Sequence, residues 1–173
     1  AIYGFINIML KAIEDEHSDS VAVAFDLKAP TFRHKMYDAY KGNRKGMPEE
    51  LAQQMPVLKE LLKALGYKLI ECPGWEADDI QGTVARFADQ NEDMHAYILS
   101  GDKDLLQLVS PNITVILAGN KEQEHYDEAK FFEKYGVKAE QFVDVKALMG
   151  DSSDNIPGVP GIGEKTALKL IAE

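Results

Sequence analysis

The chain has 173 residues, 45% of them hydrophobic, which is enough for one folded domain and excludes a wholly disordered chain. Its net charge of −10 does not by itself indicate a nucleic-acid binder. No apolar run approaches the roughly 20 residues that a membrane span needs, so an integral membrane protein is not expected. The single cysteine, Cys72, excludes an internal disulfide framework and a cysteine zinc site, and it fits a reducing compartment.

The apolar pattern predicts the elements in chain order. The opening residues carry an apolar face at helical spacing that includes Ile2, Met9 and Ile13. Because the chain starts without Met inside this helix and stops inside another helical run, we interpret it as a fragment of a longer protein. A buried strand is predicted at residues 21–25, and further strands are predicted at residues 67–72, 95–99 and 113–117, with another strand after a turn at Gly119-Asn120. Further helices are predicted at residues 48–65, 76–90, 127–135, 139–149 and 165–173.

Strands that alternate with helices indicate an α/β domain with a mostly parallel sheet. In the helix at residues 76–90, the side chains of Ile80, Val84 and Phe87 are expected to face the core. Residues 28–46 show no clear period and predict a loop. The end of the chain, rich in Gly and Pro before a helix, is typical of a separate helical module. We therefore predict two domains, residues 1–149 and residues 150–173.

Acidic residues occur in four groups, three of which directly follow predicted strands. Asp26 ends the first strand, Glu76, Asp78 and Asp79 follow the second, Asp102 and Asp104 follow the third, and Asp151 and Asp154 lie in the turn after the last long helix. Ligands of open α/β sheets collect at the carboxyl ends of the strands, so the first three groups should converge. Each acid taken singly could equally be a cap of a helix or turn. Four groups placed alike favour a metal site.

Carboxylates gathered in one cleft cannot all stay ionised without cations. Hard divalent ions such as Mg²⁺ prefer oxygen ligands and keep several waters, which suits a shared cluster of this kind. Two such ions about 3.5–4 Å apart can activate a water and stabilise the leaving oxygen in phosphodiester hydrolysis. The acidic groups therefore predict two Mg²⁺ or Mn²⁺ ions.

The segment at residues 28–46 has a local net charge of +5, opposite in sign to the net charge of the whole chain. In it, Thr31-Phe32-Arg33 and Tyr40-Lys41-Gly42-Asn43-Arg44 place cations beside aromatic rings. This interleaving suits phosphate contact combined with base stacking, and a cation near the metals could steady the charge of the transition state. Taken alone, the segment is more typical of a solvated loop with two buried tyrosines.

Residues 155–166 form a Gly- and Pro-rich turn that leads into an apolar-periodic helix. The spacing differs from that of a P-loop, because Glu164 intervenes before Lys165-Thr166 and the turn follows an acidic stretch rather than a strand. A glycine hairpin between two helices fits better. Its amides and the next helix N-terminus would bind a DNA phosphate without reading sequence. A plain connector between helices is the alternative.

Together these motifs resemble the flap endonuclease and 5′–3′ exonuclease family, including the 5′-nuclease domain of bacterial DNA polymerase I. The resemblance covers essentially the whole chain in order, and its most specific part is Gly150-Asp-Ser-Ser-Asp-Asn-Ile-Pro-Gly158. It implies a PIN-like α/β domain with a mostly parallel central sheet, a helical arch and a C-terminal helix–hairpin–helix-type DNA-binding module. It also implies metal-dependent hydrolysis of DNA at 5′ ends and 5′ flaps during replication and repair.

The resemblance assigns roles residue by residue. The metal ligands would be Asp26, Glu76, Asp78, Asp79, Asp102, Asp104, Asp151 and Asp154. Lys41 and Arg44 would contact the scissile phosphate as catalytic residues, and Tyr40 would stack near it. The DNA-binding set would comprise Arg33, Tyr40, Gly158, Gly161, Gly163, Lys165 and Thr166, with a K⁺ at the hairpin.

Further implications concern the surroundings of the chain. A polymerase region in the same parent protein and a bacterial cytoplasmic, nucleoid-associated location are expected. The family begins with a strand carrying an Asp-Gly motif, and this chain starts after it, so weak metal binding and slow cleavage are expected of the fragment. Two other functions stay open, a PIN-type ribonuclease and a non-catalytic DNA-binding module. The hairpin argues against the first because it suits duplex DNA.

Overall fold

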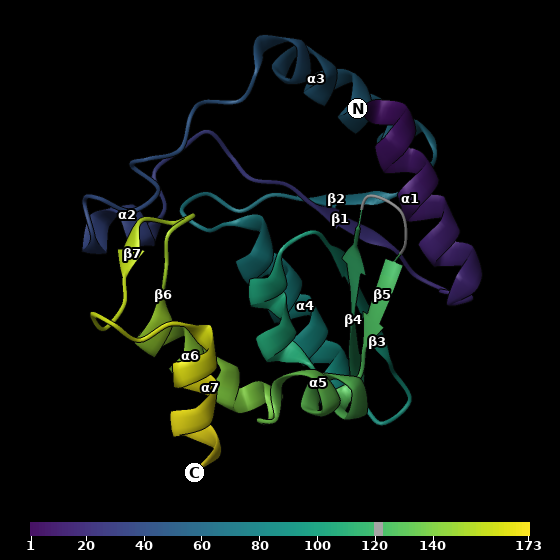
Figure 1. Ribbon diagram of the computed structural model, residues 1–173. Coiled ribbons are helices and arrows are strands. Elements are labelled where there is room, and N and C mark those ends of the chain that lie inside the picture. The colour runs from purple at the N-terminus through teal and green to yellow at the C-terminus, as the bar shows by residue number, and fades with distance from the viewer. Residues whose placement is uncertain (120–122) are drawn as a thin grey trace. The chain divides into compact units, whose positions relative to one another are not determined.

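The computed structural model describes residues 1–119 and 123–173 and divides into two compact units. Unit 1 comprises Ala1–Phe32 and Lys45–Gln81, and unit 2 comprises Arg33–Arg44 and Gly82–Glu173. The boundary falls within helix α4 (Ala77–Asp89). No described helix has the length and apolar character needed to cross a bilayer. Each unit is built around its own sheet (Figure 1).

Unit 1 packs two long helices with a two-stranded parallel sheet. Helix α1 (Ile2–Asp15) is followed by β1 (Ala22–Ala24), α3 (Glu49–Ala64), β2 (Lys68–Ile70) and the first turn of α4. β1 pairs in parallel with β2, with Val23 opposite Leu69. The buried side chains include Met9, Phe25 and Leu62. These elements confirm the positions of the predicted helices and strands, but β1 is not fully buried, since Ala22 is exposed and Val23 and Ala24 are only partly covered.

Unit 2 carries a three-stranded sheet and the remaining helices. In chain order it contains most of α2 (Phe32–Met36), the rest of α4, β3 (Ala96–Ser100), the 3₁₀-helix η1 (Lys103–Leu108), β4 (Ile113–Ala118), β5 (Gln123–Tyr126), α5 (Glu128–Tyr135), η2 (Ala139–Gln141), α6 (Phe142–Met149), β6 (Gly150–Asp151), β7 (Ile156–Pro157) and α7 (Glu164–Ala172). β4 lies between β3, which is parallel to it, and β5, which is antiparallel. The turn predicted at Gly119-Asn120 falls partly outside the described residues.

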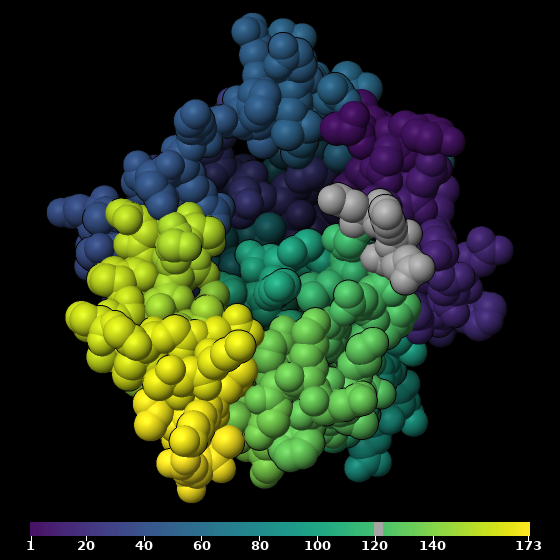
Figure 2. All heavy atoms as spheres, in the orientation of Figure 1, coloured from purple at the N-terminus to yellow at the C-terminus, as the bar shows by residue number. Residues whose placement is uncertain are grey.

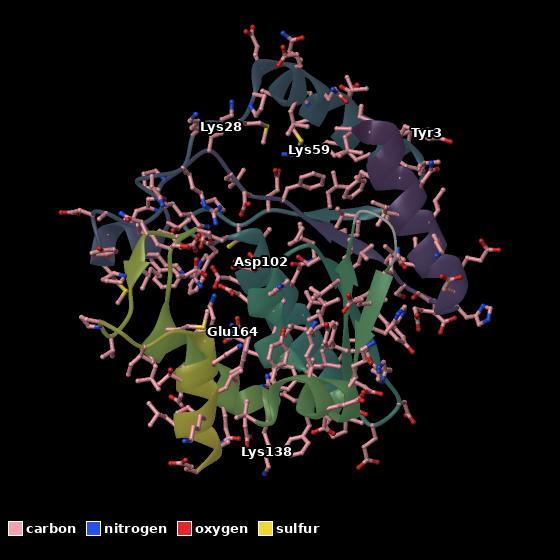
Figure 3. The ribbon with its side chains drawn as sticks, in the orientation of Figure 1. Tyr3, Lys28, Lys59, Asp102, Lys138 and Glu164 are labelled. Carbon is pink, nitrogen blue, oxygen red and sulfur yellow. The ribbon has the colours of Figure 1, made fainter. Side chains whose placement is uncertain are left out.

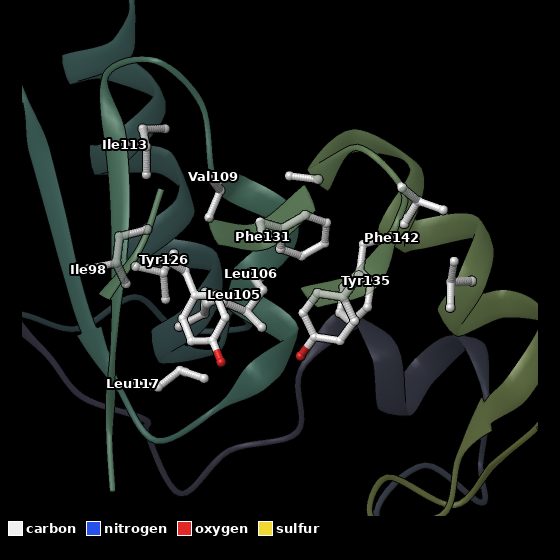
Figure 4. Close-up of a cluster of buried hydrophobic side chains, with 14 of the residues drawn as sticks. Ile98, Leu105, Leu106, Val109, Ile113, Leu117, Tyr126, Phe131, Tyr135 and Phe142 are labelled. Atoms are coloured by element: carbon white, nitrogen blue, oxygen red, sulfur yellow. The ribbon is translucent and has the colours of Figure 1, made fainter. Parts of the chain in front are cut away.

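The core of unit 2 lies between its sheet and the helices η1, α5 and α6 (Figure 4). Leu106, Ile113, Tyr126 and Phe131 are almost completely buried. Ala167 of α7 is buried in the same cluster, and Figure 2 shows this C-terminal helix, in yellow, against the green α5–α6 surface. α7 therefore contributes to the core of unit 2. The sequence-based division at residues 149 and 150 stays a prediction.

Three expectations about the fold need correction. Within residues 1–119 and 123–173, the hydrogen-bonded strands fall into β1–β2, β3–β4–β5 and an antiparallel pair β6–β7, rather than into one central sheet. The predicted loop at residues 28–46 contains the short helix α2. In α4, Ile80 is buried as expected, but Val84 and Phe87 are 46% and 63% exposed.

The exposed face of α4 has a packing explanation. A Cβ atom on Gly82 would lie 3.4 Å from a methyl carbon of Leu108 in η1, which is ordinary van der Waals contact. Ala85, one turn later, is buried. The side of α4 that carries Gly82 and Ala85 therefore packs inward, and the larger Val84 and Phe87 lie on the exposed side.

Candidate active site

The N-terminus of α4 holds three carboxylates close together. One oxygen each from Glu76, Asp78 and Asp79 can be chosen so that all three lie within 4.8 Å of one another. Glu76 is only 6% exposed. Asp78 and Asp79 occupy the first turn of the helix, where backbone N–H groups and the helix dipole favour negative charge. The local sequence thus places the three acids on one helix end.

Asp26 joins this group from the end of β1. Its Oδ1 accepts a hydrogen bond of 2.7 Å from the backbone N–H of Ala77. Asp79 and Asp78 likewise accept bonds from the backbone N–H groups of Glu76 and Asp79, at 2.9 and 2.8 Å. The capping roles considered from sequence are therefore real. A capping bond engages one oxygen of a carboxylate and leaves its charge in place, so caps alone do not explain why the charges gather.

The three carboxylates of α4, with Asp26 hydrogen-bonded beside them, fit a divalent cation. Carboxylates this close repel one another when ionised, and a cation bound among them removes the repulsion. Oxygen-only ligands from a short helical stretch and a strand end suit Mg²⁺ or Mn²⁺ rather than a soft metal. Within unit 1, the predicted convergence of Asp26 with Glu76, Asp78 and Asp79 is confirmed.

The other four acids lie in unit 2. Asp102 caps η1, where its Oδ1 accepts a bond of 2.9 Å from the backbone N–H of Asp104 (Figure 3). Asp104 and Asp151 both contact the ammonium group of one lysine, Lys146, which was not among the predicted site residues. The Nζ of Lys146 lies 2.8 Å from Oδ1 of Asp104 and donates to Oδ2 of Asp151 at 2.6 Å. Lys146 thus bridges two predicted metal ligands from different elements.

The charges of this trio depend on one another. Burial, helped by the charges of Asp102 and Asp151, raises the pKa of Asp104 above its ordinary value, although the Lys146 ammonium lowers it. Burial acts in the same sense on Asp151, but hydrogen bonds from Lys146 and from the Ser153 hydroxyl outweigh it and hold the pKa of Asp151 well below its usual range. For Lys146, burial opposes the charged form, yet the two carboxylates raise the pKa above its ordinary value. At neutral pH the lysine is a fixed cation of the site.

Asp154 is surrounded by the basic segment. The hydroxyl of Tyr40 donates to its Oδ2 at 3.1 Å, the Nζ of Lys41 lies 4.0 Å away, and Arg44 makes an ion pair with its Oδ1. Backbone contacts reinforce the docking, since the N–H of Lys41 donates to the carbonyl of Asp154 at 2.9 Å. The side chain of Asn43 donates to the carbonyl of Ser152 at 2.7 Å. The structure therefore brings Lys41 and Arg44 to the acidic loop around Asp154, and their contact with a scissile phosphate stays a prediction.

Two predicted DNA contacts in this segment differ in their surroundings. Tyr40 is 5% exposed, and its ring packs edge-on against His34. As placed, it is a packing residue and offers no open face to a base. Arg33 lies in α2 and is half-buried.

The Gly- and Pro-rich turn forms a tight hairpin anchored by β6 and β7. A Cβ on Gly158 would lie 2.3 Å from the carbonyl carbon of Met149, so only glycine allows these backbones to cross. Gly150 meets Gly158 in the same crossing and has φ +73°. Gly161, with φ +83°, turns the chain toward Gly163, the N-cap of α7. Lys165 and Thr166 are exposed in the first turn of α7.

The eight predicted metal ligands thus fall into two groups of four, one in each unit. Their union in one site stays a prediction. Lys146 was missed because a single lysine in an apolar helix carries no motif. Its one signal was its place five residues before Asp151, among mostly apolar neighbours.

An α/β chain with clustered oxygen ligands and a helix–hairpin–helix-like turn is typical of metal-dependent nucleases, and comparison with known structures agrees. The fold matches the zinc-bound bacteriophage T5 5′-exonuclease with a TM-score of 0.81 and 26% identity, over 98% of this chain and 66% of that one. It also matches a T5 flap endonuclease in complex with DNA and metal ions, with a TM-score of 0.80 and 25% identity, over 98% of this chain and 65% of that one.

The sequence makes the assignment specific. Residues 1–136 match the N-terminal resolvase-like domain of 5′-3′ exonucleases, and residues 137–173 match their C-terminal SAM fold. The thermostable DNA polymerase I of Thermus thermophilus is 47% identical over 173 residues, which is 100% of this chain and 20% of that protein. The chain therefore belongs to the 5′-3′ exonuclease family, in the form found in DNA polymerase I. It spans about a fifth of the length of the polymerases it matches.

Proposed function

We propose that this chain is a structure-specific 5′ nuclease that hydrolyses DNA phosphodiesters at 5′ ends and 5′ flaps. The observation that carries the proposal is the set of three carboxylates at the start of α4, with Asp26 beside it. Family membership supports the same reaction, because the matching domain is a 5′-3′ exonuclease. The T5 relative bound to DNA and metal ions is a flap endonuclease.

Two Mg²⁺ or Mn²⁺ ions would be held by the four acids of unit 1 together with Asp102, Asp104, Asp151 and Asp154. When bound, such ions lower the pKa of water and neutralise charge on the oxygens of the scissile phosphate. The carboxylates of the chain orient these ions. Their capping bonds to backbone N–H groups and to Ser153 restrict carboxylate rotation, so the ligands are largely preorganised.

Lys41 and Arg44 would brace the scissile phosphate. In the structure both are turned to Asp154, so their charge is held by a carboxylate until a phosphate arrives. Arginine can engage phosphate through two parallel N–H bonds, whereas lysine acts as a point charge. An exchange of partner from Asp154 to phosphate would leave the carboxylate to a metal ion. Arg33 would add a further phosphate contact, and Tyr40 would reach a base only after the segment shifts.

The hairpin would anchor the duplex. Backbone N–H groups near Gly158, Gly161 and Gly163 and the N-terminus of α7 offer donors to one phosphate, with Lys165 and Thr166 beside them. A K⁺ held by hairpin carbonyls would bridge to that phosphate. These contacts reach only the backbone of DNA, so the anchor would be independent of sequence.

We further infer the finer architecture and context from the same family. The 28–46 segment with α3 would form the helical arch of a PIN-like domain, and residues 150–173 would begin a helix–hairpin–helix-type module. The relatives are DNA polymerases several times longer than this chain, which supports a polymerase region in the parent protein. Such a protein would act in the bacterial cytoplasm at the nucleoid.

The test is cleavage of a 5′-labelled flap DNA by the chain with Mn²⁺, beside an EDTA reaction. Metal-dependent cutting near the junction is expected. Asp79→Asn should abolish cutting while flap binding, measured by anisotropy, stays largely intact. The matched control is Asp93→Asn, which makes the same change at an exposed acid outside the cluster.

Other outcomes would point to the other functions. Near wild-type cutting by Asp79→Asn would contradict its metal role. Preferred cutting of an RNA flap would indicate a ribonuclease. Tight DNA binding with no cutting under any metal condition would indicate a non-catalytic binding module.

A further inference from the structure

One aromatic pair of unit 1 is exposed directly beside the carboxylate cluster of α4. The rings of Phe32 and Trp75 pack with their centroids 5.0 Å apart and their planes tilted by 54°. The side chain of Trp75 is exposed, at 50%, whereas that of Phe32 is partly covered. Half of the Trp75 surface is therefore open to solvent, while the Phe32 ring packs against the indole at a tilt.

The backbone around the pair is held by hydrogen bonds. The N–H of Phe32 donates to the carbonyl of Gly74 at 3.1 Å, and the N–H of Trp75 donates to the carbonyl of Cys72 at 3.2 Å. The first bond ties the two chain segments together next to the rings. The backbone that carries the two rings is thus held in place, and the ring contact adds a side-chain restraint.

A structural role alone explains only part of this arrangement. Trp75 precedes Glu76 at the start of α4, where an apolar residue can pack toward the fourth helical position, here Ile80. Leucine or valine would serve equally well in that role. Neither the size of the indole nor its exposure is required by it, and exposing half of a tryptophan loses part of the stabilisation that burial would provide.

The position of Trp75 indicates what the ring would meet. Trp75 directly precedes Glu76, the buried acid of the cluster, so the chain carries the indole next to the place where a nucleotide phosphate would bind. A base is the uncharged part of a nucleotide. Stacking on an aromatic face is therefore a way to hold DNA beside clustered carboxylates that involves no charge.

We propose that the exposed face of Trp75, supported by Phe32, is a stacking site for an unpaired base of the DNA substrate. The inference rests on the proposed nuclease function and adds a base contact to it. Tyr40, the aromatic assigned to stacking by the family resemblance, is only 5% exposed. In unit 1, by contrast, the Phe32–Trp75 pair lies next to the acids in the chain and leaves the indole accessible to a base.

The experiment uses the fluorescence of Trp75, which is the single tryptophan of the chain. The chain is titrated in EDTA, which prevents cleavage, with a 5′-flap DNA whose flap carries bases. A second titration uses the same DNA with abasic units in the flap, which keeps every phosphate and removes the rings. The stacking site predicts saturable quenching by the first DNA and little quenching by the second.

Variants give an independent readout through anisotropy of labelled flap DNA. Trp75→Leu keeps an apolar side chain at the start of α4 and should weaken flap binding by roughly 5- to 150-fold, the range expected for loss of one base–aromatic stack. Trp75→Phe should lose far less. Phe87→Leu, at an exposed aromatic farther along α4, is the matched control and should bind like wild type.

Equal quenching by the two DNAs, or wild-type affinity in Trp75→Leu, would overturn the stacking site. DNA that binds by anisotropy but leaves the fluorescence unchanged would also overturn it. Failure of the wild-type chain to bind flap DNA at all would overturn the proposed nuclease function, and the stacking site with it. The two failures are therefore distinguishable.

Discussion

Replacing Lys146 by methionine should destabilise the metal-free protein. The substitution keeps an unbranched side chain but removes the cation that lies 2.8 Å from Asp104 and 2.6 Å from Asp151. Two carboxylates would then be left close together in a partly buried site without a counter-charge. The expected result is a lower melting temperature in EDTA.

The magnitude follows from the burial of the trio. Breaking a buried ion pair by removing one partner costs about 3–5 kcal/mol, whereas exposed pairs contribute about 0–1 kcal/mol. The Lys146, Asp104 and Asp151 side chains are 23%, 32% and 15% exposed, so the site is intermediate. We expect a loss of about 1–3 kcal/mol, discounted from the fully buried case because solvent screens the pair. For a chain of this size that is a fall of roughly 3–10 °C.

The assay is thermal unfolding followed by circular dichroism, in EDTA and in Mn²⁺. A divalent ion should replace the missing charge, so Mn²⁺ should raise the melting temperature of Lys146→Met by more than that of wild type. Lys138→Met is the matched control, because its ion pair with Glu140 is 3.9 Å long and both side chains are 75% exposed. Equal melting of Lys146→Met and wild type in EDTA would refute the reasoning, and so would equal responses to Mn²⁺.

Three further predictions test other parts of the chain. Mn²⁺ should raise the melting temperature of wild type and do so less in Asp79→Asn, because binding to the native state adds stability; an equal rise in both proteins would place the ion elsewhere. Gly158→Ala should lower the melting temperature and weaken duplex binding, because its Cβ would lie 2.3 Å from the backbone of Met149, while Gly46→Ala, with nothing within 4 Å, should change neither. Stability should fall as pH rises above about 10, the ordinary pKa of tyrosine. Burial and a hydrogen bond to Glu124 raise the pKa of Tyr126, so the folded chain holds a proton that the unfolded chain releases. Urea unfolding at two pH values should show a smaller fall in Tyr126→Phe.

Local signals predicted most of the secondary structure. Asp127 is a residue type that favours the N-cap, and its Oδ1 accepts a bond of 2.8 Å from the backbone N–H of Lys130 at the start of α5. Gly66, with φ +87°, follows α3 where the helix was expected to end. These helix ends depend on residues within one helical turn, so they can be predicted from the local sequence.

The sequence by itself also determined the family and the chemistry of the first acidic group. Glu76, Asp78 and Asp79 share one helix end because their spacing puts them there, and Asp26 follows because β1 and β2 are parallel neighbours. The separation of the strands into several sheets was not predictable in this way. Strand pairing joins residues that are far apart in the chain. An apolar run can predict that a strand forms, but it does not predict which other strand pairs with it.

Tertiary structure alone decided which charges neutralise one another. Lys146 meets Asp104 across 42 positions of the chain, and Asp154 meets Tyr40 across 114. It also decided that Tyr40 is buried while Trp75 is exposed, and that α4 packs through Gly82 and Ala85 rather than through Phe87. Side-chain type sets what a residue can do, but its partners and its access to solvent depend on which distant segments the fold brings beside it.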